Sequence, residues 1–147
     1  MGECCWAHDA CWLPRRQNKS SVVAPSQWWL LFGLFFALTL VLEAPVYLVA
    51  FQTRPFKERI ILWFCANATS YPPVFFLFPY LPISPLAREL SAEVWAPLCE
   101  IGVASFLLGK ITPRERGWIV VANLLSWLTG RLIVATVFGY APWALFV

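Results

Sequence analysis

The chain has 147 residues, of which 60% are hydrophobic and 13% are charged, and its net charge is +3. Its mean hydropathy is +0.66. A soluble domain carries about 25% charged residues, so this composition excludes a water-soluble globular protein and predicts an integral, multi-pass membrane protein. The lysines and arginines form no stripe along an exposed face, so we predict no binding to nucleic acid.

Residues 1–27 precede the first apolar segment, and we expect them to form a disordered N-terminal tail without a core. The tail contains Cys4, Cys5, His8 and Cys11, a spacing from which a zinc site can be built. One histidine with no folded segment around it does not define such a site, so we predict neither a metal nor another cofactor. Five cysteines in total, an odd number, also argue against a disulfide framework.

Four apolar segments follow, and a transmembrane helix needs about 20 mostly apolar residues. They cover residues 28–51, 60–81, 90–108 and 118–138. We therefore predict an all-α protein in which residues 28–147 form one membrane domain with four transmembrane helices. Two successive prolines, Pro72 and Pro73, should break or strongly bend the second helix. Six basic residues flank the first and third loops and four lie on the other side, which places those loops in the cytoplasm.

The second and fourth segments begin with similar sequences. KERIILWFCANATS, from Lys57, and RERGWIVVANLLS, from Arg114, both contain Glu-Arg followed by Ala-Asn-x-x-Ser. The spacing from Glu43 to Arg59 is 16 residues, as is the spacing from Glu100 to Arg116. We interpret this pattern as a tandem repeat of a two-helix unit, with the units at residues 28–81 and 90–139. Two helices per unit would give both units the same orientation in the membrane.

The repeat also places four polar side chains at one depth. Measured from the side of the first and third loops, a rise of 1.5 Å per residue puts Glu43 and Asn67 at roughly 12 Å, Glu100 at roughly 13 Å and Asn123 at roughly 10 Å. These four residues are our candidate ion or solute site, with Ser70 and Ser126 as secondary polar groups. Asparagine, serine and carboxyl groups at this depth can instead hold helices together without any transport role.

A second polar pair is predicted nearer the other side of the membrane. Glu93 and Arg131 both lie roughly 23 Å from the reference side by the same count. Opposite charges at equal depth on consecutive helices indicate a candidate ion pair. The alternative is that Arg131 extends to the nearby interface and makes no pair.

Three classes of function fit this pattern. The first is a small transporter or channel for a proton, a cation or a small polar solute, working as a homo-oligomer because four helices enclose little volume. The second is an assembly or accessory subunit of a larger membrane complex, in which the polar side chains at the common depth only hold the helices together. A membrane enzyme ranks last, because the apolar segments contain no histidine and no aspartate and the chain has no Cys-x-x-Cys motif.

Overall fold

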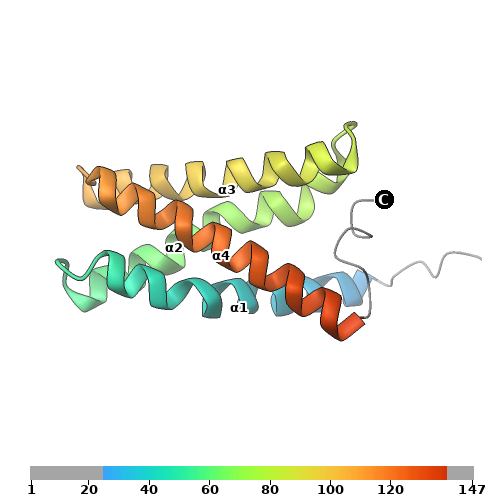
Figure 1. The fold of residues 1–147 in the computed structure, drawn as a ribbon, viewed down its shortest axis with the longest axis horizontal. Coiled ribbons are helices and arrows are strands. Elements are labelled where there is room, and N and C mark those ends of the chain that lie inside the picture. Colours follow the sequence, from blue (N-terminus) through green and yellow to red (C-terminus); the bar gives the residue numbers. More distant parts are fainter. Residues whose placement is uncertain (1–24, 139–147) are drawn as a thin grey trace, which may run out of the picture.

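A computed structural model describes residues 25–138 as a bundle of four helices. They are α1 (Pro25–Ala50), α2 (Phe56–Phe76), α3 (Pro85–Leu108) and α4 (Pro113–Phe138), with a single 3-10 turn, η1 (Phe78–Tyr80), after α2. The predicted all-α, four-helix architecture is confirmed (Figure 1). Most of the predicted N-terminal tail and the last nine residues of the predicted membrane domain lie outside the described residues.

The surface of the bundle is apolar and its interior contains carboxyl groups, the reverse of a soluble protein. Val41, Phe106 and Leu132 are 69%, 88% and 62% exposed, whereas Glu43 and Glu100 are each 1% exposed. Three stretches, Gln27–Ala50, Phe56–Tyr80 and Pro85–Leu108, are long and apolar enough to cross a bilayer. The protein is therefore an integral, multi-pass membrane protein. That α4 also spans the membrane stays a prediction.

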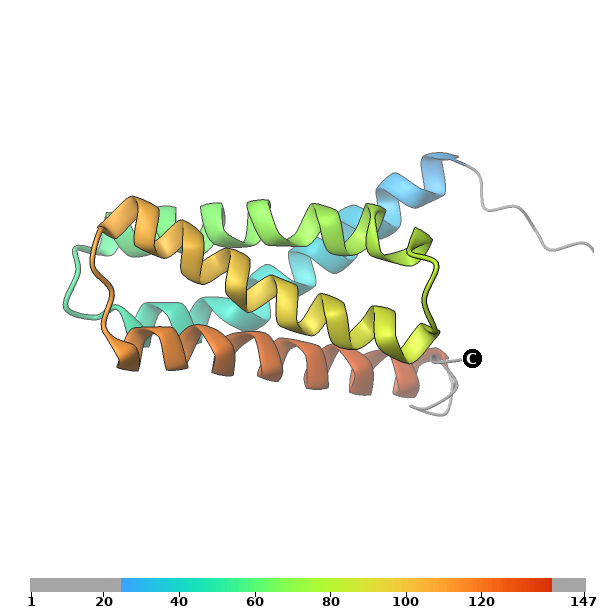
Figure 2. The ribbon, with the colours of Figure 1, turned by 90° about the horizontal axis from the view of Figure 1, so that it is seen from above.

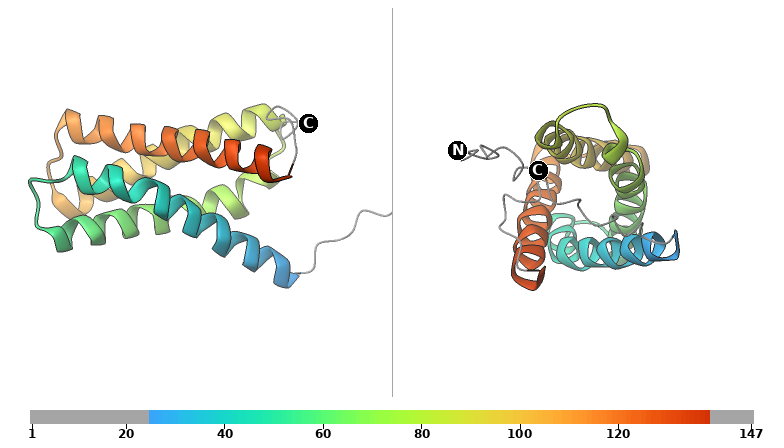
Figure 3. Two further views of the ribbon diagram at one scale, coloured as in Figure 1. Left: turned by 60° about the horizontal axis from the view of Figure 1, so that its bottom comes forward. Right: turned by 90° about the vertical axis from the view of Figure 1, so that its right-hand side faces the viewer.

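Each helix packs against its two neighbours around the bundle. Viewed end-on, the helices follow one another in the order α1, α2, α3, α4, so that α4 returns to α1 (Figure 3). Loops 51–55 and 109–112 lie at one end of the bundle, which we call the loop end. The other end, where α1 and α3 begin and α2 and α4 finish, is the terminus end. There the first turns of α1 diverge from the other helices (Figure 2).

Capping residues in the sequence explain where α3 and α4 begin. Ser84 is the N-cap of α3, its side chain accepts a hydrogen bond from the backbone N–H of Ala87 at 3.3 Å, and proline occupies the first helical position. Thr112 and Glu115 form a capping box at the start of α4, with reciprocal contacts of 2.6 and 3.2 Å. Gly109 ends α3 at a φ of 75°, which a residue with a side chain rarely adopts.

The predicted break at Pro72 and Pro73 is wrong, because α2 continues through both prolines to Phe76, while the alternative of a strong bend there stays a prediction. The φ angle of a proline suits a helix. A proline destabilises a helix because it lacks the N–H that would donate to the preceding turn and because its ring clashes with that turn. Both prolines stand close to the end of α2, so little helix depends on the missing donors. The helical pattern of backbone hydrogen bonds is present after the prolines, since the N–H of Leu77 donates to the carbonyl of Pro73 at 2.8 Å.

Candidate functional site: a polar ring beside a central cavity

The four side chains predicted to share one depth lie together inside the bundle, one on each helix. Glu43 is on α1, Asn67 on α2, Glu100 on α3 and Asn123 on α4, and all four are buried. The two predicted secondary groups are buried with them, each one turn after an asparagine. We call the set the polar ring: Glu43, Asn67, Ser70, Glu100, Asn123 and Ser126.

The carboxyl group of Glu43 accepts hydrogen bonds from both helices next to α1. Asn67 Nδ2 donates to its Oε2 at 3.0 Å, and Ser126 Oγ donates to its Oε1 at 2.7 Å. Both donors also reach a carbonyl oxygen of their own helix. Asn67 Nδ2 lies 3.1 Å from the carbonyl of Trp63, and Ser126 Oγ lies 3.0 Å from that of Asn123. Neither donor would therefore lose its last acceptor if Glu43 were replaced.

The carboxyl group of Glu100 accepts three hydrogen bonds. Asn123 Nδ2 donates to Oε2 at 2.7 Å and Ser70 Oγ donates to Oε1 at 2.9 Å. The third donor is the hydroxyl of Tyr47, which crosses the bundle from α1 to reach Oε2 at 2.6 Å. Asn123 Nδ2 has a second acceptor, the carbonyl of Ile119 at 3.1 Å. Within residues 25–138, the Tyr47 hydroxyl donates to Glu100 alone, so Glu100 is the more strongly bound carboxyl.

The two sets of hydrogen bonds are arranged in a crossed pattern. Each glutamate bonds to the asparagine on the helix that follows it and to a serine on the other neighbouring helix, so the ring passes through all four helices. One polar atom stands apart from this network. Asn67 Oδ1 is buried and accepts no hydrogen bond from any residue that the structure describes.

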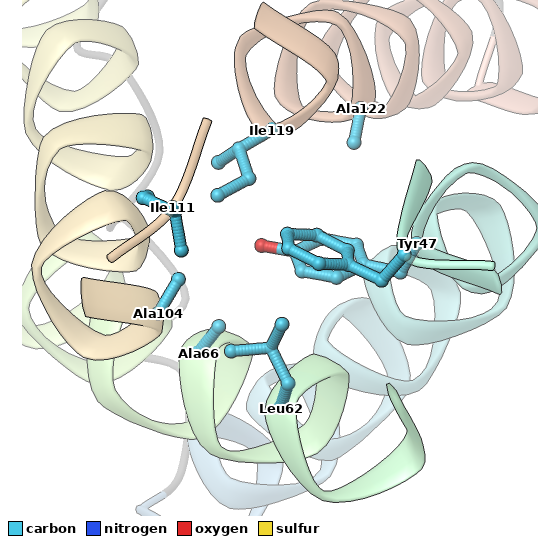
Figure 4. Close-up of a cluster of buried hydrophobic side chains, with 8 residues drawn as sticks. Tyr47, Leu62, Ala66, Ala104, Ile111, Ile119 and Ala122 are labelled. Atoms are coloured by element: carbon cyan, nitrogen blue, oxygen red, sulfur yellow. The ribbon is translucent and has the colours of Figure 1, made fainter. Parts of the chain in front are cut away.

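An apolar cluster fills the bundle on the loop-end side of the ring. We call it the apolar plug, and Figure 4 shows its side chains converging from all sides of the bundle. The Tyr47 ring lies within the plug while its hydroxyl bonds to Glu100, so this residue joins the plug to the ring. The members of the plug are Tyr47, Phe51, Leu62, Ala66, Ala104, Ile111, Ile119 and Ala122.

A cavity of about 260 Å³ lies on the opposite side of the ring, toward the terminus end. All six ring residues contribute to its wall, so the carboxyl groups form its floor. Three aromatic side chains, Phe35, Tyr71 and Trp127, and two charged ones, Glu93 and Arg131, also line it. We call this space the central cavity. It extends from the ring toward the terminus end, whereas the plug fills the bundle on the loop-end side.

Arg131 forms its ion pair with Glu89, where Glu93 was the predicted partner. Trp127 Nε1 donates to the same Glu89 oxygen at 2.9 Å, and the guanidinium lies 5.4 Å from the centre of the Trp127 ring. Helix α3 begins at Pro85, earlier than predicted, so Glu89 is a helical residue one turn before Glu93. Glu93 lines the central cavity and makes no hydrogen bond or ion pair with the part of the chain that is described.

Two residues of this site were missed in the sequence. Tyr47 follows Glu43 by four residues, so it lies on the same face of α1 one turn nearer the loop end, and that spacing could have drawn attention to it. Glu89 lies just before the apolar segment 90–108, so hydropathy alone does not predict it to be helical. The Ser-Pro pair at Ser84, which is typical of a helix start, would have placed it on α3.

Comparison of the chain with protein-family models, with curated proteins and with solved structures gave no match. The chemistry available to the site is that of carboxyl, amide and hydroxyl groups enclosed in a membrane-spanning bundle. Among the described residues there is no cluster of three or more histidine, cysteine, aspartate or glutamate side chains that could hold a metal ion.

Proposed function

We propose that the protein transports a proton, another cation or a small polar solute, and that the polar ring is its binding site. The observation that carries this proposal is the position of Glu43 and Glu100, two buried carboxyl groups that form the floor of the central cavity inside a membrane-spanning bundle. Ionisable side chains are costly within a membrane, and those that occur there generally mark a pathway for ions or substrates.

The hydrogen bonds around Glu43 are compatible with gain and loss of a proton. Ser126 has a single hydroxyl hydrogen and two acceptors in reach, Glu43 at 2.7 Å and the carbonyl of Asn123 at 3.0 Å. When Glu43 is ionised, Ser126 can donate to it. When Glu43 is protonated, it can donate to Ser126 while Ser126 donates to the carbonyl. The ring thus keeps its contacts in both states, a property suited to proton transfer.

The predicted two-helix repeat adds a reason for a shared central site. Glu43 bonds to the asparagine of its own unit and the serine of the other, and Glu100 does the same in reverse. This crossed pattern supports a pseudo-two-fold axis along the membrane normal, as in transporters built from parallel repeats. A site on that axis would be shared equally by the two units. We also expect a homo-oligomer, because a single cavity of about 260 Å³ offers little room for a pore.

The alternative is an accessory subunit of a larger membrane complex. Two observations favour it: the ring hydrogen bonds tie α1 and α2 to α3 and α4, and large apolar side chains are exposed on every helix. Hydrogen bonds between helices in a membrane contribute about 0.6 kcal/mol each on average. Under this alternative the ring only stabilises the bundle, and a partner subunit covers part of the apolar surface.

The test is proton and cation flux in liposomes that contain the purified protein and an internal pH-sensitive dye. We expect an imposed gradient to dissipate faster than in empty liposomes, and we expect Glu43→Gln and Glu100→Gln to abolish the difference while the protein remains folded. Glutamine keeps the shape of the side chain and removes the titratable carboxyl group. Glu58→Gln is the matched control, because Glu58 is exposed at the start of α2, outside the ring.

Carboxyl-stretch infrared spectra of the same three variants supply a readout that needs no knowledge of the cargo. If the ring exchanges protons, a carboxyl band changes with pH in the wild type and is lost in one of the two ring variants. Wild-type flux through both glutamine variants, together with pH-independent spectra, would contradict transport and favour the accessory subunit. Co-purification with a fixed partner would then identify the complex.

A further inference from the structure

We infer that the central cavity binds a small organic cation, a protonated amine with an apolar body, which enters from the terminus end. This inference names the ligand of the cavity described above and therefore rests on the proposed function. It is carried by the charge of the cavity wall, by its unused hydrogen-bond acceptors and by its aromatic lining.

The charged groups of the cavity favour a cation. Glu43, Glu93 and Glu100 all line it, and the one basic residue in its wall is Arg131. The guanidinium of Arg131 is already paired with Glu89. Because Glu89 offsets the charge of Arg131, each of these carboxyls that is ionised makes the wall negative, and in a low-dielectric interior a positively charged ligand gains more from an ionised carboxyl than it would in water.

The polar groups left unused in the cavity are acceptors. Asn67 is a wall residue that is 0% exposed, and its buried Oδ1, which would need a small rotation of the side chain to reach the cavity surface, accepts no hydrogen bond within residues 25–138. The carboxyl of Glu93 likewise has no hydrogen-bond donor there. By contrast, the donors of the ring are directed at the two glutamates or at backbone carbonyls. A ligand that satisfies this wall must donate hydrogen bonds, as an ammonium group does.

Size and lining distinguish an organic cation from a metal ion. A cavity of about 260 Å³ is far larger than a bare ion and approaches the small end of small-molecule sites, which begin at about 300 Å³. Phe35, Tyr71 and Trp127 provide aromatic surface for an apolar body and for contact with the cationic group. No cluster of metal-ligating side chains is present in the described part of the chain.

We infer that the ligand enters near η1, where a second hollow adjoins the cavity. This second hollow, of about 380 Å³, is lined by residues of η1, of the end of α2 and of the start of α3. It shares five lining residues with the central cavity, namely Val74, Ala92, Glu93, Trp127 and Arg131. Glu93 and Arg131 therefore both lie where the two spaces meet, and Arg88 also lines the second hollow. The charge of Arg131 is offset by Glu89, and Arg88 bonds to backbone carbonyls, so Glu93 is the carboxyl that an entering cation would encounter before reaching the ring.

The test measures binding of phenethylammonium to the purified protein in nanodiscs at neutral pH by ligand-observed NMR. The neutral isostere 2-phenylethanol has nearly the same apolar body and controls for partition into lipid. We expect saturable binding of the amine, no saturable binding of the alcohol, and little competition from sodium ions. Glu93→Gln should weaken amine binding by about tenfold or more, because it removes one charge without removing a hydrogen bond of the fold. Glu58→Gln should leave binding unchanged.

Equal binding of amine and alcohol, or amine binding that Glu93→Gln does not change, would overturn the inference. The liposome assay separates this outcome from failure of the proposed function. If the amine binds with the expected selectivity and wild-type liposomes dissipate neither the imposed cation gradient nor a gradient of phenethylammonium itself, the inference stands and transport is refuted. If flux depends on the ring glutamates and the amine does not bind, transport stands and the organic-cation inference is refuted.

Discussion

Replacing Glu100 by leucine should destabilise the bundle more than replacing Glu43 by leucine. Sequence reasoning treats the two as equivalents, and both are 1% exposed. The two glutamates differ in whether the groups that donate hydrogen bonds to them would still have an acceptor after the substitution. Glu43 accepts from two groups that each have a backbone carbonyl as a second acceptor, whereas Glu100 also accepts from Tyr47, whose hydroxyl has no other acceptor in the described chain.

The expected magnitudes follow from these contacts. Glu43→Leu removes two hydrogen bonds between helices and should cost about 1 kcal/mol of unfolding free energy. Glu100→Leu removes two comparable bonds, from Ser70 and Asn123, and leaves a buried hydroxyl without a partner. An unpartnered buried hydroxyl costs about 1–3 kcal/mol, so the total should be about 2–4 kcal/mol.

Reversible unfolding in mixed micelles of mild detergent and dodecyl sulfate, followed by far-UV circular dichroism, measures these differences. The decisive variant combines Glu100→Leu with Tyr47→Phe, which removes the unpartnered hydroxyl. This double variant should recover about 1–3 kcal/mol relative to Glu100→Leu alone, while Tyr47→Phe by itself should be mildly destabilising. The four proteins form a double-mutant cycle that isolates the Tyr47–Glu100 interaction.

Two results would refute this reasoning. Equal destabilisation by the two leucine variants would mean that Tyr47 adds nothing to the ring. Failure of Tyr47→Phe to rescue Glu100→Leu would mean that the cost arises elsewhere, for example from poor packing of leucine against the apolar plug.

Three further predictions concern topology, capping and the ion pair. Single cysteines at Thr53 and Lys110, in a background without other cysteines, should be labelled from the same side of the membrane; labelling from opposite sides would contradict four spans. Thr112→Ala should lower the unfolding free energy by about 1 kcal/mol through loss of the capping box, measured by the same unfolding assay. Arg131→Leu should cost about 1–3 kcal/mol because the Glu89 carboxyl loses its charged partner and keeps the Trp127 N–H, and adding Glu89→Leu should restore part of that loss; no recovery would show that the pair is not stabilising.

Counting along the chain was enough to place the polar residues at a common level. Segments of sufficient apolar length must form helices in lipid, since no water is present to satisfy an open backbone. A helix rises by a fixed distance per residue, so the depth of Glu43, Asn67, Glu100 and Asn123 could be estimated from the ends of their segments. The all-α, multi-pass architecture and the proximity of these four side chains were predictable for that reason.

The tertiary structure alone decided which groups bond to which. The depth of a residue does not determine the rotation of its helix about the helix axis. That rotation determines that Ser70 bonds to Glu100, that Ser126 bonds to Glu43 and that the Tyr47 hydroxyl reaches Glu100 across the bundle. The start of α3 depends on local capping signals that hydropathy does not register, so only the structure shows Glu89 as a helical residue in an ion pair with Arg131. The central cavity, too, exists only once the helices diverge on one side of the ring and pack around the apolar plug on the other.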